Sequence, residues 1–405
     1  MILSSRLFKK AIVFLVILSA HNFYRVAFLT ESLTDLIEVA VLGLVFFLIT
    51  VNVLFNPVST VKKHFKTEVY LFLIAVFFSM FIAFAYHNQD FKTTAIAQRS
   101  MYFYAFYFLL HYFELNAKNL EKIMIFMGFL WIIFFVMQFI AYPIKLFDVR
   151  IGVERGTLRI FLAGLGFMFF AYYKYLQLYL TKQKIKYGVF VLLFFVVGAI
   201  LQGTRQLLAT MTLLTMAFIF FNKGVKSRIF IITLSSIAGV AIFFILYDMF
   251  MELLVLTQRE LTADRTNIRV LAMNYFLNDF MPSTSAYIFG NGQDSMNSTY
   301  GQKMHFLRNT LGFYQSDIGI IGDYTRYGVL FVIAQLSISV KIIFGKLHPD
   351  IEYLRYLFIG LALTMFSGRN LFGSSSGIVF IVLIIYIIEY YRTKHVNQEN
   401  DYETG

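Results

Sequence analysis

Residues 69–86 read VYLFLIAVFFSMFIAFAY, a run with no charged side chain. A helix of about 20 mainly apolar residues is long enough to cross the hydrocarbon core of a bilayer. The whole chain shares this character, because 59% of its 405 residues are hydrophobic and only 14% are charged. A soluble domain is roughly a quarter charged. The composition therefore indicates a protein with several membrane-spanning segments.

About twelve apolar runs predict membrane-spanning helices. In chain order they cover residues 11–30, 36–55, 69–86, 95–113, 120–141, 158–180, 187–202, 206–221, 229–248, 327–345, 352–369 and 376–391. A transmembrane β-barrel is excluded, because it needs short segments of alternating polarity. The predicted fold is an all-α polytopic membrane protein with one long extracytoplasmic loop.

This pattern divides the chain into four parts. Helices one to nine occupy residues 1–248, the long loop occupies 249–326, and helices ten to twelve occupy 327–391. The remaining residues, 392–405, form a cytoplasmic tail. From residue 393 this tail is polar, so we expect it to be disordered.

The lysines predict the orientation of these helices. Positive residues collect in cytoplasmic loops. If the N-terminus is cytoplasmic, lysines fall in the cytoplasmic segments 61–68, 174–187 and 222–228. By this map 16 of the 19 lysines lie on the cytoplasmic side. The map also places the C-terminus in the cytoplasm. These loops account for the net charge of +12, so the charge gives no reason to expect a nucleic-acid partner.

The arginines are distributed in the opposite way. Only Arg6, Arg228, Arg355 and Arg392 of the 16 arginines fall inside. The other 12 lie outside or in the outer halves of helices: Arg25, Arg99, Arg150, Arg155, Arg159, Arg205, Arg259, Arg265, Arg269, Arg308, Arg326 and Arg369. Because the orientation rule counts both residue types alike, it does not explain this set.

Arginine differs from lysine in its planar guanidinium, which binds phosphate or carboxylate through two hydrogen bonds at once. The set of outer arginines therefore predicts an anionic ligand on that side. Any one of them has a simpler interpretation, which is pairing with an aspartate of the loop or with lipid headgroups.

Residues 201–206, LQGTRQ, join two apolar runs with almost no loop. Arg205 is thereby held at or just below the outer surface. A charge held near the membrane is costly and is usually functional. The alternative is an arginine at a helix end that extends to the headgroups.

The long loop is expected to be functional and partly helical, because structureless loops of this length are rare. Apolar residues recur at helical spacing over 267–280, with Arg269 near the edge of the apolar stripe. Pro282 and the turn at Gly290-Asn-Gly292 are predicted to end helices. An amphipathic helix lying on the membrane surface is the alternative.

Residues 316–328, SDIGIIGDYTRYG, lead into the tenth predicted helix. Asp317 is the acidic residue that we single out here as a general base or hydroxyl acceptor. A helix cap, or a salt bridge to Arg326, is the alternative role for its carboxylate.

Other chemistries find little support in the sequence. It has no cysteine, no P-loop, no Gly-x-Ser-x-Gly and no His-Glu-x-x-His, and its 7 histidines are scattered. Neither a metal site nor a cofactor is predicted.

In this order, the three segments resemble the superfamily of bacterial O-antigen polymerases and O-antigen ligases. The resemblance rests on Thr204-Arg205 at a tight outer hairpin, on Arg269 before Ile288-Phe-Gly-Asn-Gly292, and on Ser316-Asp317 before Tyr327-Gly328. It covers about residues 200–335, together with the helix count and the single long outer loop.

The resemblance implies a metal-independent glycosyltransferase of the bacterial cytoplasmic membrane. Its substrate would be an oligosaccharide on undecaprenyl diphosphate, transferred to an acceptor sugar with inversion. Membrane lipids, the growing polysaccharide and a chain-length regulator would be its partners. Arg205 and Arg269 would hold the diphosphate, and fixed positive donors would stabilise this leaving group. Further substrate-binding candidates are Arg150, Arg155, Arg265, Arg308, Arg326, Gly290 and Gly292.

One departure bears on the subtype. The ligases typically have a histidine followed by asparagine in the last motif, where this chain has Ser316-Asp317. His305 lies upstream and would need a different alignment. A polymerase that joins repeat units is therefore favoured over a ligase. A lipid-linked oligosaccharide flippase and a noncatalytic export or assembly partner remain alternatives.

Overall fold

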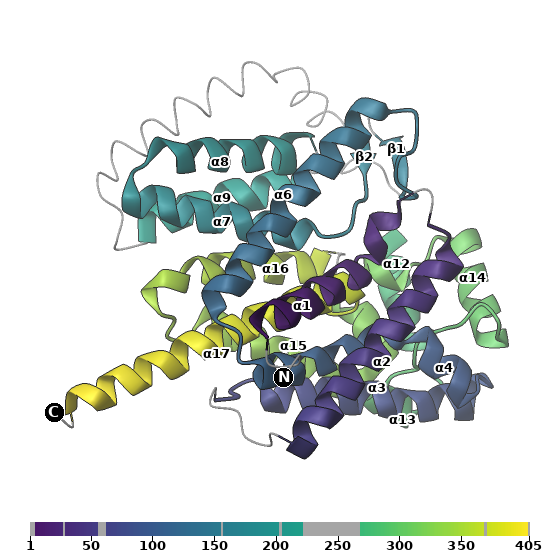
Figure 1. The fold of residues 1–405 in the computed structure, drawn as a ribbon. Helices are drawn as coiled ribbons and strands as arrows, with labels where there is room; N and C mark the ends of the chain where they lie inside the picture. Colours follow the sequence, from purple (N-terminus) through teal and green to yellow (C-terminus); the bar gives the residue numbers. More distant parts are fainter. Residues whose placement is uncertain are drawn as a thin grey trace. The chain divides into compact units, whose positions relative to one another are not determined.

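The computed structural model describes residues 5–26, 29–55, 62–154, 157–201, 205–221, 268–367 and 371–403 (Figure 1). The predicted helix at 229–248 and the first part of the long loop lie outside these ranges. The chain divides into two compact units. The first unit contains residues 1–127, 146–148 and 267–405, and the second contains 128–145 and 149–266.

Among the residues that the structure describes, five helices are long and apolar enough to cross a membrane. They are α2 (Glu31–Phe55), α3 (Lys66–His87), α6 (Ala117–Ala141), α15 (Ile320–Ile343) and the first part of α17, Ser375–Lys394. The runs predicted over 36–55, 69–86, 120–141 and 376–391 lie within four of them, and α15 spans most of 327–345. The described residues thus form a helical membrane protein with one small hairpin.

The first unit is built around α17 (Ser375–Glu403, yellow in Figure 1). In the most apolar 18-residue stretch of α17, 78% of the residues are buried. The corresponding stretches of the other four helices are 28–44% buried. Residues 378–388 are apolar all round the helix, as is typical of a helix enclosed by others. It packs against α1 (Arg6–Ala20) and α5 (Phe106–Phe113).

The remaining elements of the first unit include four short helical turns: η2 (Asn22–Arg25), η3 (Arg99–Ala105), η6 (Gln315–Asp317) and η7 (Pro349–Ile351). The other helices are α4 (Phe91–Ala97), α12 (Ile268–Asn274), the π-helix η5 (Tyr275–Asp279), α13 (Thr284–Phe289), α14 (Thr299–Leu311) and α16 (Tyr353–Ser367). Helix α15 packs against α3, α13 and α16.

In its described part, the second unit holds an antiparallel hairpin and three helices. Strands β1 (Ile151–Glu154) and β2 (Thr157–Ile160) pair with Ile151 opposite Ile160. The helices are α7 (Leu165–Lys182), α8 (Ile185–Phe195), which continues as the π-helix η4 (Val196–Leu201), and α9 (Arg205–Phe221). Helix α6 begins in the first unit and ends in the second.

Two predicted helices are interrupted. The run 11–30 ends as a helix at Ala20, where the buried ring of His21 bonds to the carbonyl of Ile17 and the chain turns. The run 95–113 divides into α4, η3 and α5. Gln98 lies between α4 and η3, is fully buried and donates to the carbonyl of Val76 in α3. A buried polar group needs such a partner, and this bond fixes the chain where α4 ends.

Two further predictions are wrong at their boundaries. The helix predicted to begin at 158 begins instead at Leu165, because 157–160 pair with β1 and Gly164 adopts a left-handed φ of 94°. The tail predicted to be disordered from 393 continues α17 to Glu403. It has no glycine or proline before Gly405 to stop the helix.

Candidate functional site

Two of the three sequence motifs contact each other in the first unit. Helix α15 is interrupted at Gly328, which has φ 77° and ψ −172°. The carbonyl oxygens of Thr325 and Arg326, just before this interruption, accept hydrogen bonds from the turn Gly290-Asn-Gly292. Asn291 N–H donates to Thr325 O at 2.9 Å, and Gly292 N–H donates to Arg326 O at 2.7 Å. The turn thus satisfies carbonyls that an unbroken helix would have used.

Glycine is required on both sides of this contact. A Cβ at Gly290 would lie 2.3 Å from Arg326 O, and a Cβ at Gly328 would lie 2.1 Å from Ile288 O. Both residues also have the left-handed φ that glycine tolerates. The contact is therefore backbone against backbone. It gives Gly290 and Gly292 a packing role, while their predicted contact with substrate stays a prediction.

Asn291 connects the interrupted helix to the end of α3. Its Nδ2 donates to Thr325 O at 3.0 Å, so Oδ1 is the amide atom that faces His87. His87 Nε2 lies 2.8 Å from this Oδ1. Because a carbonyl oxygen only accepts, Nε2 must carry the proton. Asn291 is fully buried, so the histidine is held from the interior side.

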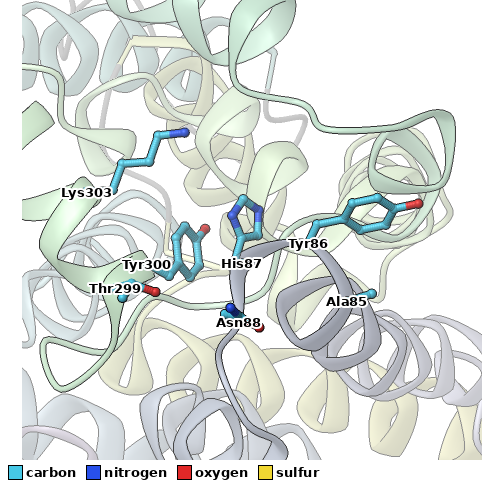
Figure 2. Close-up of a pocket in the computed structure, with 7 residues that line it drawn as sticks. All are labelled: Ala85, Tyr86, His87, Asn88, Thr299, Tyr300 and Lys303. Atoms are coloured by element: carbon cyan, nitrogen blue, oxygen red, sulfur yellow. The ribbon is translucent and has the colours of Figure 1, made fainter.

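Figure 2 shows the pocket that His87 lines together with Ala85, Tyr86, Asn88, Thr299, Tyr300 and Lys303. Its volume is ≈ 390 Å³. The His87 ring stacks on Tyr300, with centroids 4.2 Å apart and planes 15° apart. Phe280 lies next, 5.8 Å from His87, and Lys303 Nζ lies 5.3 Å from the Phe280 ring. The pocket thus combines stacked rings with a positive charge.

A second cation lies at the interruption of α15. Arg326 Nε donates to Gln315 Oε1 at 3.0 Å, and buried Gln315 donates from Nε2 to Thr325 Oγ1 at 3.0 Å. In the part of the chain that the structure describes, neither Arg326 nor Lys303 forms an ion pair. Two cations without carboxylate partners suit an anionic ligand.

Arg308 is neutralised instead. Its Nη2 lies 2.5 Å from Asp294 Oδ2, and the Asp294 side chain is only 4% exposed. The Tyr300 hydroxyl is within reach of these charges. Burial and the Asp294 carboxylate raise the pKa of Tyr300 well above its ordinary value, although Arg326 and Arg308 act to lower it. The hydroxyl stays protonated and donates to Gly292 O at 3.3 Å.

Gln89 fixes the segment between the glycine turn and α14. It is fully buried. Its Nε2 donates to Gln293 O at 2.8 Å and to Thr94 Oγ1 at 3.0 Å. Its Oε1 accepts from Ser295 N–H at 2.9 Å and from Ser298 Oγ at 2.7 Å. One side chain thus binds the pocket's two walls together.

The other predicted residues are dispersed. Arg269 is exposed at the start of α12, and Asp317 is exposed in η6, where it accepts from Ser316 Oγ at 3.3 Å. The structure records no ion pair between Asp317 and Arg326 among the described residues. In the second unit, Arg205 begins α9 with its side chain outside the described part, and Arg150 lies 5.3 Å from the Phe161 ring.

Arg155 and Arg265 lie outside the described residues. Among those described, no three His, Asp or Glu side chains are grouped as metal ligands would be.

Sequence reasoning missed His87, Gln89, Tyr300 and Lys303. The polar stretch His87-Asn-Gln-Asp90 was a usable signal, because it ends a helix on the side predicted to be outer. No protein-family model matches this sequence, and no curated protein sequence does either.

Proposed function

We propose that this chain is a polymerase that joins oligosaccharide repeat units carried on undecaprenyl diphosphate into a surface polysaccharide. In this proposal about twelve helices cross the bacterial cytoplasmic membrane, both termini are cytoplasmic, and residues 249–326 face outward. The observation that carries the proposal is Arg326, a half-buried cation without a carboxylate partner among the described residues, at a helix interruption built by two of the three motifs.

The reaction requires such a cation. As the bond between the sugar's anomeric carbon and the diphosphate breaks, its electron pair stays on the diphosphate oxygen. Fixed donors aimed at this oxygen stabilise the developing charge without reorganising. Arg326 is fixed by Gln315, which is itself bonded to Thr325. In this proposal Arg269 and Arg205 keep the diphosphate-binding role predicted from the sequence.

The role of each arginine can be tested by charge reversal in cells that make the polymer. Arg326→Glu, Arg269→Glu and Arg205→Glu should each abolish long polymer and leave lipid intermediates that carry a single repeat. Arg6→Glu is the matched control, because Arg6 is exposed on the side predicted to be cytoplasmic. It should give polymer of normal length at equal abundance in the membrane.

The lipid intermediates also separate the alternatives. Loss of a polymerase leaves single repeats on the outer leaflet, where an impermeant periodate-type reagent oxidises them. Loss of a flippase leaves them protected on the inner leaflet. Normal polymer in all three arginine variants would refute the proposed mechanism.

A further inference from the structure

The pocket at the end of α3 is distinct from the site at Arg326, whose guanidinium binds the diphosphate in the proposed function. Its ≈ 390 Å³ falls in the range of small-molecule sites, which is about 300–1,000 Å³. Its polar groups come from two walls: Tyr86 and Asn88 from the end of α3, and Thr299 and Lys303 from the start of α14. Hydroxyl, amide and ammonium groups of this kind match the hydroxyls of a sugar.

His87 is prepared to accept a proton in this pocket. Nε2 is the protonated nitrogen, because it must donate to Asn291 Oδ1. Nδ1 of the neutral ring is then the nitrogen with a lone pair, and it forms no hydrogen bond with any described residue. A histidine held in one tautomer by a buried partner is the arrangement that general-base catalysis requires.

The same asparagine joins the pocket to the site of the leaving group. Asn291 bonds to His87 through Oδ1 and to the carbonyl of Thr325 through Nδ2. Thr325 directly precedes Arg326. The histidine and the guanidinium are thus connected through one buried side chain and one peptide unit.

We infer that this pocket binds the acceptor glycan and that His87 removes the proton from its attacking hydroxyl. The inference rests on the proposed function. The hydroxyl oxygen forms a bond to the anomeric carbon of the donor as the bond from that carbon to the diphosphate breaks. The proton passes to Nδ1 of His87, and the bond's electron pair leaves with the lipid diphosphate. The protonated ring then releases its proton to water.

Lys303 and Tyr300 position the acceptor and the ring. Tyr300 stacks on His87 and fixes its plane. Lys303 lines the same pocket as Tyr300 and His87 (Figure 2). Of the groups that line it, only histidine changes protonation near neutral pH. Asp294, on the neighbouring segment, is already paired with Arg308.

The test uses the full chain in phospholipid vesicles, with lipid-linked repeat units extracted from cells that lack this protein. His87→Gln should lower the rate of repeat joining by about 100-fold or more, as loss of a general base does. Gln still offers an N–H to Asn291, so folding is preserved. His305→Gln is the matched control, because His305 is exposed on α14 and does not line the pocket. It should retain the wild-type rate.

Three further measurements separate catalysis from binding or folding. Binding of added undecaprenyl diphosphate, measured directly on the protein in vesicles, should be unchanged in His87→Gln and weakened in Arg326→Gln. The wild-type rate should fall on the acidic side of its pH profile, where a base becomes protonated, and His87→Gln should lack this decline. Lys303→Met should raise the apparent KM for repeat units more than it lowers the maximal rate.

The outcomes distinguish this inference from the function on which it rests. If wild-type protein forms no polymer from the lipid-linked units, the proposed function fails. If wild-type protein forms polymer and His87→Gln matches it in rate and pH profile, only the acceptor pocket is wrong. Weakened binding of undecaprenyl diphosphate to His87→Gln would also overturn it, because the pocket would then serve the donor.

Discussion

Glu389 and His87 each organise a polar network in the first unit, but only His87 faces a cavity. Glu389 is fully buried in α17. Its Oε1 accepts from Tyr107 Oη at 2.8 Å and from Phe65 N–H at 2.7 Å, and its Oε2 lies 2.7 Å from His111 Nε2. All of these groups are closed to solvent. A carboxylate in an apolar interior needs such donors simply to be tolerated.

In the network of His87, the partner is buried and the titratable group is open to a pocket. Its buried part is the neutral amide of Asn291, whose bonds are all directed at protein groups. Its open part is the histidine ring, which lines a pocket that has a positive charge at its edge. A titratable group in a cleft is a candidate for function, whereas one enclosed by its partners is a candidate for stability. The difference lies in access to solvent, since both networks are hydrogen-bonded.

The largest expected effect is on stability, in the closed network. Glu389→Ala removes the shared acceptor of Tyr107, His111 and the Phe65 amide, leaving buried donors unsatisfied. Breaking a buried pair in this way costs about 3–5 kcal/mol. The free energy of unfolding, measured by denaturant titration in detergent, should fall by that amount. Glu389→Gln is the matched control and should lose less, because its amide keeps one acceptor.

The rate of repeat joining per folded molecule should be unchanged in Glu389→Gln. A variant that folds normally but no longer joins repeats would show that Glu389 takes part in the chemistry. The proposed division between the two networks would then be wrong.

The sequence predicts elements well where a local pattern determines them. The runs 36–55, 69–86 and 120–141 correspond to α2, α3 and α6, because each is apolar over a membrane's thickness and contains no proline. The helix expected over 267–280 appears as α12 and η5, and the chain leaves it before Pro282. The glycine turn at 290–292 is also where a helix, α13, ends.

The site could not be predicted in the same way, because its contacts join distant parts of the chain. His87 and Asn291 are 204 residues apart, and Gln89 and Ser295 are 206 apart. No periodicity within either segment specifies such a pairing. The interruption of α15 has a local signal in Gly328, but its partner at Gly290 does not follow from that signal.

An intermediate effect is expected from Gln89, which stands between the two kinds of network. It is fully buried like Glu389, but it secures a wall of the pocket. Gln89→Ala leaves the Ser295 amide without its acceptor, at a cost of about 1–3 kcal/mol for an unsatisfied buried group. Hydrogen exchange at Ser295 N–H should accelerate by a corresponding factor. Exchange in the core of α17 should be unaffected, because the opening is local.

Gln302→Ala is the control for this experiment, because Gln302 is exposed on the same helix, α14, that the segment precedes. It should leave Ser295 exchange unchanged. Equal acceleration in α17 and at Ser295 would mean that the Gln89 segment and the core unfold as one unit.

The smallest effect is expected at the ion pair of Asp294 and Arg308, which contrasts with Arg326, a cation without a carboxylate partner among the described residues. The Arg308 side chain is 27% exposed, so solvent screens the pair, and Asp294→Asn should cost about 1 kcal/mol. The same substitution changes the pKa of Tyr300. Burial and the Asp294 carboxylate both raise this pKa in the wild-type protein. In the unfolded chain a tyrosine releases its proton at a pH of about 10.

The sign of the pH dependence follows from this difference. Because the folded pKa of Tyr300 is higher than the unfolded one, its contribution to stability is complete below pH of about 10 and declines as pH rises further. Asp294→Asn removes one cause of the raised pKa, so the alkaline decline should be shallower than in wild-type protein. In a Tyr300→Phe background, the stability of the protein should decline equally at alkaline pH whether residue 294 is Asp or Asn. If the two proteins still differed in this background, other tyrosines would cause the alkaline decline in stability. Asp294 would then have no effect on the pKa of Tyr300.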